Sequence, residues 1–151
     1  MGNRPQNLPG HVWPAHNAEV HRLMMSHSND DQHSGAFPRA LRIRREADFK
    51  RVYQGNVHAA DGTLVVLGCD NGMCTTRLGL SISRRVGNAV TRNRWKRLIR
   101  EAFRQQRASL PRGLDLVVRP RRGAIPSLHG VQESLPRLAR RVERQLRRLR
   151  P

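Results

Sequence analysis

A single helix of mixed character constrains what this chain can fold into more than any other part of its sequence. Between residues 89 and 107, apolar side chains recur at the three- and four-residue steps that place them on one face of an α-helix. That face, which we expect in the core, comprises Trp95, Leu98, Ile99, Ala102 and Phe103. A second face carries Asn93, Arg97, Arg100 and Arg104, with Arg92 and Lys96 beside it. We therefore expect a helix that packs into a core on one side and holds a polyanion on the other.

The positive charge of the chain is concentrated in the same part of the sequence. Residues 1–40 hold equal numbers of basic and acidic residues, so the whole net charge of +18 belongs to residues 41–151. All basic residues except Lys50 and Lys96 are arginines, whose guanidinium groups pair with phosphate oxygens in bidentate fashion. Because self-repulsion of this size is usually offset by nucleic acid, we expect a nucleic-acid partner.

The sequence gives no sign of a membrane partner and suggests one folded domain. No apolar run is long enough to span a membrane, and no signal-type apolar core is present, so we expect a cytoplasmic protein. Residues 1–40 are rich in Pro, His, Asn and Ser without apolar periodicity, which predicts a disordered extension. Met24 and Met25 leave open that translation begins within it. Residues 41–151 are expected to form a single domain.

The apolar pattern of that domain predicts the order α-β-β-β-α-β-α, a small α+β fold with one core. Beside the arginine-rich helix, we expect a first helix at 41–55, strands at 63–69, 77–83 and 113–120, and a last helix at 127–149. A further short strand is expected at 56–59. The turn signal at 70–72 predicts an antiparallel hairpin of the strands on either side of it. Pro136 is expected to kink or restart the last helix, for which packing on the sheet is favoured over a coiled-coil dimer.

The sequence contains no pattern typical of a protein active site or a metal centre. It lacks an HExxH motif, a glycine-rich phosphate loop and paired carboxylates at general acid–base spacing. Cys69 and Cys74 have no zinc-ligand spacing and are expected to be reduced thiols at the hairpin. Asp48 and Asp115 are separated by a helix and strands. We therefore predict no catalytic residue and no metal ligand on the protein.

Three blocks of the sequence resemble the protein subunit of bacterial ribonuclease P. The longest reads R-L-G-L-S-I-S-R-R-V-G-N-A-V at 77–90 and continues through R-N-R at 92–94 and K-R at 96–97 to R-E-A-F-R at 100–104. An earlier block, D-F-x-x-V-Y at 48–53, resembles the first helix of that family. A later block, L-P-x-G-L-D-L-V-V at 110–118, resembles the strand that follows its arginine-rich helix. The resemblance extends in order over residues 41–149.

This resemblance implies both a fold and a set of partners. The arginine-rich helix would make a left-handed crossover between parallel strands of a mixed sheet, in a fold of the ribosomal-protein second-domain type. The partners would be the catalytic RNA of ribonuclease P and precursor tRNA with its 5′ leader, and not DNA. Mg²⁺ held mainly by the RNA subunit and the substrate would support phosphodiester hydrolysis by the RNA, so the protein alone would bind no metal and would not be catalytic.

By the same resemblance, two surfaces share the binding of RNA. The turn before the arginine-rich helix and the helix itself are expected to face the catalytic RNA, through Arg84, Arg85, Arg92, Asn93, Arg94, Lys96, Arg97, Arg100 and Arg104. A cleft between the first helix and the sheet is expected to hold the leader, with Phe49 and Tyr53 stacking on its bases. Leu64 and Val66 are expected on the sheet wall of that cleft. The alternative for Phe49 and Tyr53 is that both rings lie in the core.

Two other functions remain open from the sequence. A structural RNA-binding protein of ribosomal type would share the fold and the charge, although it gives no reason for the blocks at 92–104. A DNA-binding regulator usually needs a recognition helix on a helix-turn-helix or zinc framework. The predicted order of elements provides neither framework.

Overall fold

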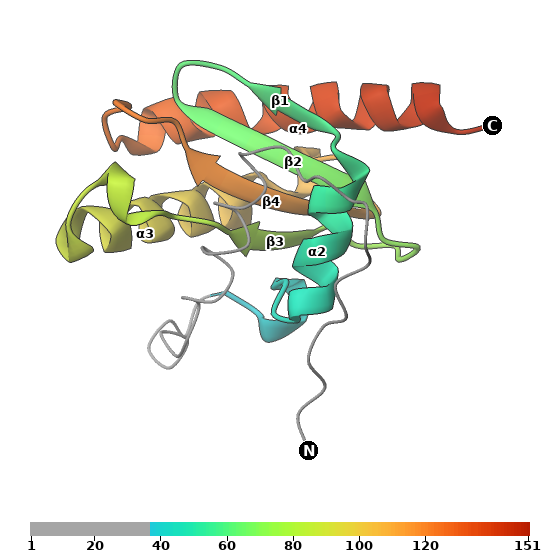
Figure 1. The fold of residues 1–151 in the computed structure, drawn as a ribbon, viewed down its shortest axis with the longest axis horizontal. Helices are drawn as coiled ribbons and strands as arrows, with labels where there is room; N and C mark the ends of the chain where they lie inside the picture. The colour runs from blue at the N-terminus through green and yellow to red at the C-terminus, as the bar shows by residue number, and fades with distance from the viewer. Residues whose placement is uncertain (1–36) are drawn as a thin grey trace, which may run out of the picture.

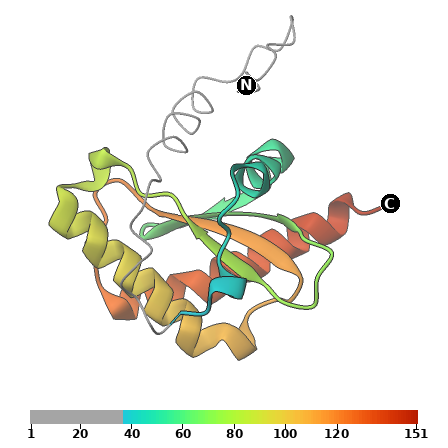
Figure 2. The same cartoon turned by 90° about the horizontal axis from the view of Figure 1, so that it is seen from below.

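A mixed four-stranded sheet separates two layers of helices in the computed structural model, which describes residues 37–151 (Figure 1). One face is covered by α2 (Glu46–Gly55), and the other by α3 (Ala89–Gln106) and α4 (Leu128–Leu149) (Figure 2). The strands are β1 (His58–Ala60), β2 (Leu64–Asp70), β3 (Arg77–Leu80) and β4 (Leu114–Pro120). Short 3₁₀ turns are η1 (Arg39–Leu41), η2 (Arg84–Val86) and η3 (Arg107–Ser109). The predicted α+β order is confirmed.

The N-terminal part of the folded region begins earlier than the sequence predicts. Most of the predicted extension, residues 1–36, lies outside the described residues. Residues 37–40, which the prediction places in the extension, belong to the fold. Phe37 is 6% exposed, and its ring meets that of Phe103 edge-on with 5.4 Å between the ring centroids. Burial of this ring on α3 explains why the ordered domain includes residues before 41.

The first helix is shorter than predicted because the chain before it follows the sheet. The N–H of Ile43 donates to the carbonyl of Leu78 at 2.9 Å, so the chain at Arg42 and Ile43 pairs in parallel with the outer edge of β3. α2 therefore begins at Glu46 rather than at 41. At its other end, Asn56 adopts a left-handed conformation with φ of 51°, which asparagine tolerates better than most residues.

The strand order in the sheet is β1-β2-β4-β3, and the predicted hairpin of residues 63–69 with 77–83 is wrong. β2 pairs antiparallel with both β1 and β4, whereas β3 pairs in parallel with β4. The tight hairpin is that of β1 and β2. Its turn is closed by Asp61, whose carboxylate accepts hydrogen bonds from the N–H groups of Thr63 at 2.8 Å and Leu64 at 3.0 Å. β4 takes the place between β2 and β3 because its side chains are almost all buried, which requires a central position.

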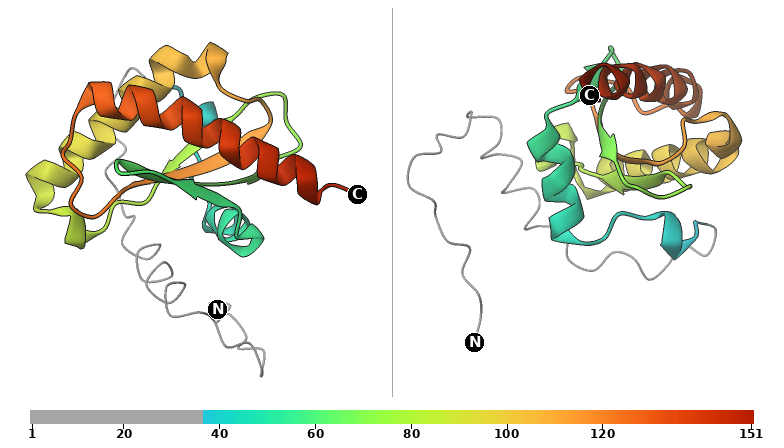
Figure 3. Two further views of the ribbon diagram at one scale, coloured as in Figure 1. Left: turned by 90° about the horizontal axis from the view of Figure 1, so that it is seen from above. Right: turned by 90° about the vertical axis from the view of Figure 1, so that its right-hand side faces the viewer.

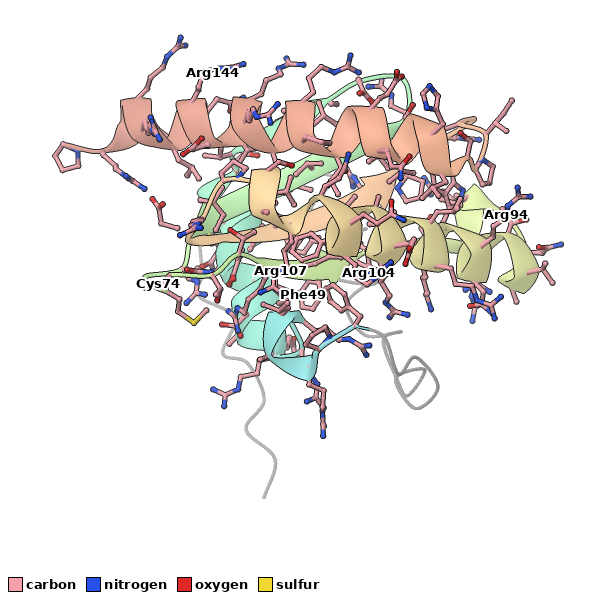
Figure 4. All side chains as sticks on the ribbon, turned by 180° about the vertical axis from the view of Figure 1, so that it is seen from behind. Phe49, Cys74, Arg94, Arg104, Arg107 and Arg144 are labelled. Atoms are coloured by element: carbon pink, nitrogen blue, oxygen red, sulfur yellow. The ribbon has the colours of Figure 1, made fainter. Side chains whose placement is uncertain are left out.

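The connection between the parallel neighbours β3 and β4 is left-handed. α3 leads from the end of β3 to the start of β4 across the face opposite α2. Seen from the α3 side with both strands running upward, β4 lies to the left of β3, as a comparison of Figures 1 and 4 shows. Most such crossovers are right-handed. The unusual hand implied by the resemblance is therefore confirmed.

α4 continues through Pro136 without interruption, contrary to the expected kink or restart. Proline has no N–H to donate to the carbonyl four residues earlier, which is that of Gln132. The side chain of Gln106, in the last turn of α3, donates to this carbonyl instead, at 2.7 Å. On its apolar face, Leu135 and Leu138 are fully buried in the core. The expected packing of the last helix on its own sheet is thereby confirmed.

Apolar side chains fill a layer on each side of the sheet. The larger layer lies beneath α3 and α4 and contains Trp95 and Phe103, both fully buried as predicted. The smaller layer lies beneath α2 and contains Phe49, Val52 and Tyr53. Within residues 37–151, no helix has the length and apolar character needed to cross a membrane.

Candidate nucleic-acid interface

The position of α3 is fixed by its N-terminal cap and by its buried face. The side-chain oxygen of Asn88 accepts a hydrogen bond from the N–H of Thr91 at 2.9 Å, which caps the helix. Trp95, Ile99 and Phe103 are fully buried, and burial of each such side chain stabilises the fold by roughly 1.5–3 kcal/mol. Because these contacts hold one face of α3, its polar face is presented in a fixed orientation.

A groove of about 1120 Å³ opens between α3, α2, the outer edge of β3 and the segment that precedes α2. Its α3 wall carries cations one helical turn apart, namely Arg92, Lys96 and Arg100. The segment before α2 contributes Arg39, Arg42, Arg44 and Arg45. Apolar side chains between these walls include Phe49, Leu80 and Ile82. Cationic walls around an apolar floor suit single-stranded nucleic acid, which has charged phosphates and apolar base faces.

The structure divides the predicted RNA-binding residues between this groove and the outer surface. Arg92, Lys96 and Arg100 line the groove and are half-buried. Exposed outside it are Arg84, Arg85, Asn93, Arg94, Arg97 and Arg104. Figure 4 shows Arg94 near the start of α3 and Arg104 towards its end. Arg104 makes hydrogen bonds of 3.1 and 2.6 Å to Glu101, so its charge is partly neutralised within the helix.

Residues 39–45 form a cationic wall that the sequence does not predict. Arg42 fixes this segment, because its guanidinium donates to the carbonyl of Phe37 at 2.9 Å and lies 5.4 Å from the centroid of the Phe37 ring. Arg44 and Arg45 are exposed beside it. The run R-I-R-R at 42–45 is visible in the sequence. It has no periodicity, however, and its place opposite α3 follows only from its pairing with β3.

An ionic network ties α2 to the sheet beside the groove. Asp115 of β4 is fully buried and accepts hydrogen bonds from Arg77 Nε at 2.8 Å and Nη2 at 2.6 Å. Arg51 of α2 donates to the same carboxylate at 2.9 Å. Asp48 lies 3.3 Å from the Arg51 guanidinium and 3.4 Å from that of Arg77. Two carboxylates that are distant in sequence are thus bridged by two shared arginines.

The network keeps the buried carboxyl ionised. Burial by itself raises the pKa of Asp115, but hydrogen bonds from Arg77, Asn71 and Arg51 outweigh burial and hold this pKa below its ordinary value. A carboxylate whose oxygens are occupied by arginines is poorly suited to act as a general acid or base. Within residues 37–151, no cluster of three or more His, Cys, Asp or Glu side chains could hold a metal ion. Within the described residues, the network therefore has a structural role, which is to hold α2 on the sheet.

The residues predicted to bind the leader do not share one surface. Phe49 lines the groove, but only 9% of it is exposed. Tyr53 lies in the apolar layer beneath α2 and outside the groove lining, and burial raises the pKa of its phenol. Both rings thus belong to the core layer, which was the alternative to stacking on bases.

Leu64 and Val66 face the opposite side of the sheet, so their predicted place in the same cleft as Phe49 is wrong. Both are fully buried in the layer beneath α3 and α4. The residues of β2 that face α2 are Val65, Leu67 and Cys69. β2 is almost entirely apolar, so its sequence lacks the polar alternation that would have shown which residues face α2.

Comparison with known proteins identifies the family. The family described as ribonuclease P matches residues 37–149, which include every helix and strand described above. The chain belongs to the ribonuclease P protein family. The ribonuclease P protein component of Brevibacillus brevis is 36% identical over 107 residues, which cover 70% of this chain and 85% of that protein. The component from Thermotoga maritima is 34% identical over 113 residues, which cover 72% and 97% of the two chains.

Solved structures of ribonuclease P proteins share this fold. That of Staphylococcus aureus superposes with a TM-score of 0.59 at 35% identity, covering 66% of this chain and 93% of its own. That of Thermotoga maritima superposes with a TM-score of 0.51 at 30% identity, covering 73% and 98%. The small α+β fold with its mixed sheet is therefore a ribonuclease P protein fold.

Proposed function

We propose that this protein is the RNA-binding subunit of ribonuclease P and supports removal of the 5′ leader from precursor tRNA. Membership of the family makes RNA the expected partner and tRNA processing the expected pathway. The observation that carries the finer proposal is the groove, in which the cations of α3 meet those of residues 39–45. Its site of action is expected to be the cytoplasm.

The α3 wall of the groove is assigned to the catalytic RNA. Arg92, Lys96 and Arg100 contact successive phosphates, and the exposed arginines of η2 and α3 extend the same contact around the helix.

The wall formed by residues 39–45 is assigned to the leader. Arg44 and Arg45 neutralise its phosphates, while its bases reach the apolar floor. Because Phe49 exposes only a small part of its ring, stacking contributes less than the phosphate contacts. Binding of the leader should therefore depend little on base identity.

Bond breaking is assigned to the RNA subunit. Mg²⁺ held by the RNA and the substrate would activate the attacking water and stabilise the leaving oxygen. Both carboxylates beside the groove are engaged by arginines, so they offer no free acid–base pair. The protein supplies positive charge and positions the two RNAs, which lowers the Mg²⁺ concentration needed for cleavage.

The assignment of the α3 wall is tested by measuring the affinity for catalytic RNA at several salt concentrations. The test variant carries Arg92→Gln, Lys96→Gln and Arg100→Gln. The matched control carries Lys50→Gln, Arg112→Gln and Arg122→Gln, which remove equal charge from three separate exposed positions. Loss of three phosphate contacts should make the drop in affinity between 50 and 200 mM salt about 20-fold smaller than for the parent. Equal salt dependence of the two variants would contradict the assignment.

The leader wall is tested with the assembled complex of protein and catalytic RNA. The parent should bind precursor tRNA more tightly than mature tRNA, and Arg44→Gln with Arg45→Gln should reduce this preference. Leaders of different base composition should bind alike. An undiminished preference in the double variant would exclude this wall. Equal affinity of the free protein for duplex DNA and for catalytic RNA at matched salt would favour a DNA-binding function instead.

A further inference from the structure

The outer face of α4 is a second cationic surface, on the side of the sheet opposite α2 (Figure 3). This helix carries six exposed arginines and two glutamates. The arginines are Arg137, Arg140, Arg141, Arg144, Arg147 and Arg148. Their three- and four-residue spacing places them in one stripe opposite the buried apolar face, with Arg144 near its centre (Figure 4). We refer to these six residues as the α4 stripe.

Only part of this charge is neutralised by the protein. Arg137 pairs with Asp61 at 2.6 Å, and Arg147 pairs with Glu143 at 2.7 Å. The other four residues of the stripe have no acidic partner within residues 37–151. Two of them reach only backbone carbonyls, Arg140 that of Ser109 at 3.4 Å and Arg141 that of Ala60 at 3.3 Å.

An isolated stripe of this kind is unfavourable for the helix that carries it. Like charges three and four residues apart on a helix repel one another, and the α4 stripe repeats that spacing along its whole length. From Arg137 to Arg148 it extends about 16 Å, at 1.5 Å per residue. That length accommodates several phosphates of a nucleic-acid strand. A polyanion along the helix would remove the repulsion.

The buried face of α4 argues against a membrane as that polyanion. An amphipathic helix that binds a lipid surface inserts its apolar face among the acyl chains. In this protein that face is already occupied, because Val131, Leu135 and Val142 are fully buried in the core. The guanidinium groups of its outer face remain available to an outside partner. A phosphate backbone needs no more than that.

We infer that the α4 stripe binds the phosphate backbone of a further RNA segment, separate from the catalytic RNA and the leader that the proposed function places in the groove. This inference rests on the proposed function for the identity of the polyanion as RNA. The groove opens at the β3 edge of the sheet, whereas α4 packs over β1 and β2 towards the other edge, so a segment seated in the groove does not lie on the stripe. The protein thus joins this further segment to those in the groove. The test below distinguishes its two sources, the catalytic RNA and the body of precursor tRNA.

The inference is tested with a variant that carries Arg140→Gln, Arg144→Gln and Arg148→Gln. A partner variant with Lys at the same positions keeps the charge. The control is the scattered triple of Lys50→Gln, Arg112→Gln and Arg122→Gln. One experiment titrates catalytic RNA alone, and another titrates precursor tRNA against the assembled complex of protein and catalytic RNA. Each is run at 50 and 200 mM salt.

Raising the salt from 50 to 200 mM lowers the affinity of the parent for RNA. In one of these titrations, this decrease in affinity should be about 20- to 40-fold smaller for the Gln variant. The Lys variant should follow the parent. The titration that responds identifies the source of the segment bound to the stripe. Should the Gln triple fail to fold, Arg144→Gln alone should make the salt-dependent decrease in affinity about threefold smaller than for the parent. Thermal unfolding verifies that each variant is folded.

Two results would overturn the inference. The first is that the Gln triple matches the scattered control in both titrations. The second is that the Gln triple loses binding to phosphatidylserine vesicles while its RNA binding is unchanged. If the α4 variant has no effect on RNA binding while the groove variant has a strong effect, the inference fails and the proposed function stands. If neither variant has an effect, the proposed function is contradicted as well.

Discussion

Replacing Asp115 with Asn tests the ionic network that fastens α2 to the sheet beside the groove. The substitution keeps the volume of the side chain, so it creates no cavity, and the Asn oxygen can still accept one hydrogen bond. It removes the negative charge that faces Arg77 and Arg51. We expect the free energy of unfolding at pH 7 to fall by about 3 kcal/mol. Urea unfolding measures this as a lower midpoint with an unchanged m value.

The expected magnitude follows from the exposure of the two arginines. The side chain of Asp115 is fully buried and that of Arg77 is 17% exposed. Removing one partner of a buried ion pair costs about 3–5 kcal/mol, because the other charge is left unpaired. Arg77 keeps Asp48 at 3.4 Å, which favours the lower end of that range. Arg51 is 49% exposed, so its pair contributes less than about 1 kcal/mol.

The difference between parent and variant should depend on pH in a defined direction. The pKa of Asp115 is lower in the folded than in the unfolded protein, so its contribution is present above the unfolded pKa and is lost as pH falls through the folded pKa. The parent's advantage should be constant above about pH 5 and shrink at more acidic pH. A loss below about 1 kcal/mol at pH 7 refutes the assignment. An equal effect of Arg77→Gln in the Asp115→Asn background and in the parent would also refute this assignment.

Three further substitutions have defined outcomes. In Gly79→Ala the new Cβ would lie 2.9 Å from a ring carbon of Phe49, so thermal unfolding should show a loss of about 1–3 kcal/mol; an unchanged Tm would contradict this packing. Gln106→Ala should destabilise by about 0.5–1.5 kcal/mol because it leaves a carbonyl beside Pro136 without its donor. The effect should disappear in a Pro136→Ala background, and an equal effect in both would exclude that explanation. Burial raises the pKa of Asp61, but backbone N–H groups and a guanidinium outweigh it and lower the pKa to about 2. Asp61→Asn should therefore cost about 1–2 kcal/mol at pH 7. In urea titrations this difference should shrink as pH falls from about 5 through 2, and a pH-independent difference would contradict these hydrogen bonds.

The elements that depend on local pattern could be predicted from the sequence. The apolar spacing of Trp95, Ile99 and Phe103 is enough to predict α3 and the face that it buries. The cations that line the groove follow from the same spacing, because they lie beside the buried face. These are the parts of the site for which the residues themselves carry the information.

The features that depend on distant pairing could not be predicted. Arg77 and Asp115 are partners in the parallel register of β3 and β4, and nothing near either residue indicates the other. The wall at 39–45 reaches the groove only because it pairs with the edge of β3. The side of the sheet that Leu64 and Val66 face could not be predicted, because β2 is buried on both faces and its sequence lacks the polar alternation that would distinguish them. Non-local strand order therefore decides which side chains form the site.

Cleavage of precursor tRNA at low Mg²⁺ tests the central claim most directly. Protein alone, catalytic RNA alone and the two together are compared at matched salt, with the variant Arg92→Ala, Arg94→Ala and Lys96→Ala beside the parent. We expect no cleavage by the protein alone, slow cleavage by the RNA, and rapid cleavage by both only when the protein retains these cations. Cleavage by the purified protein, or equal stimulation by the variant and the parent, would contradict the division of work between a cationic protein groove and a catalytic RNA.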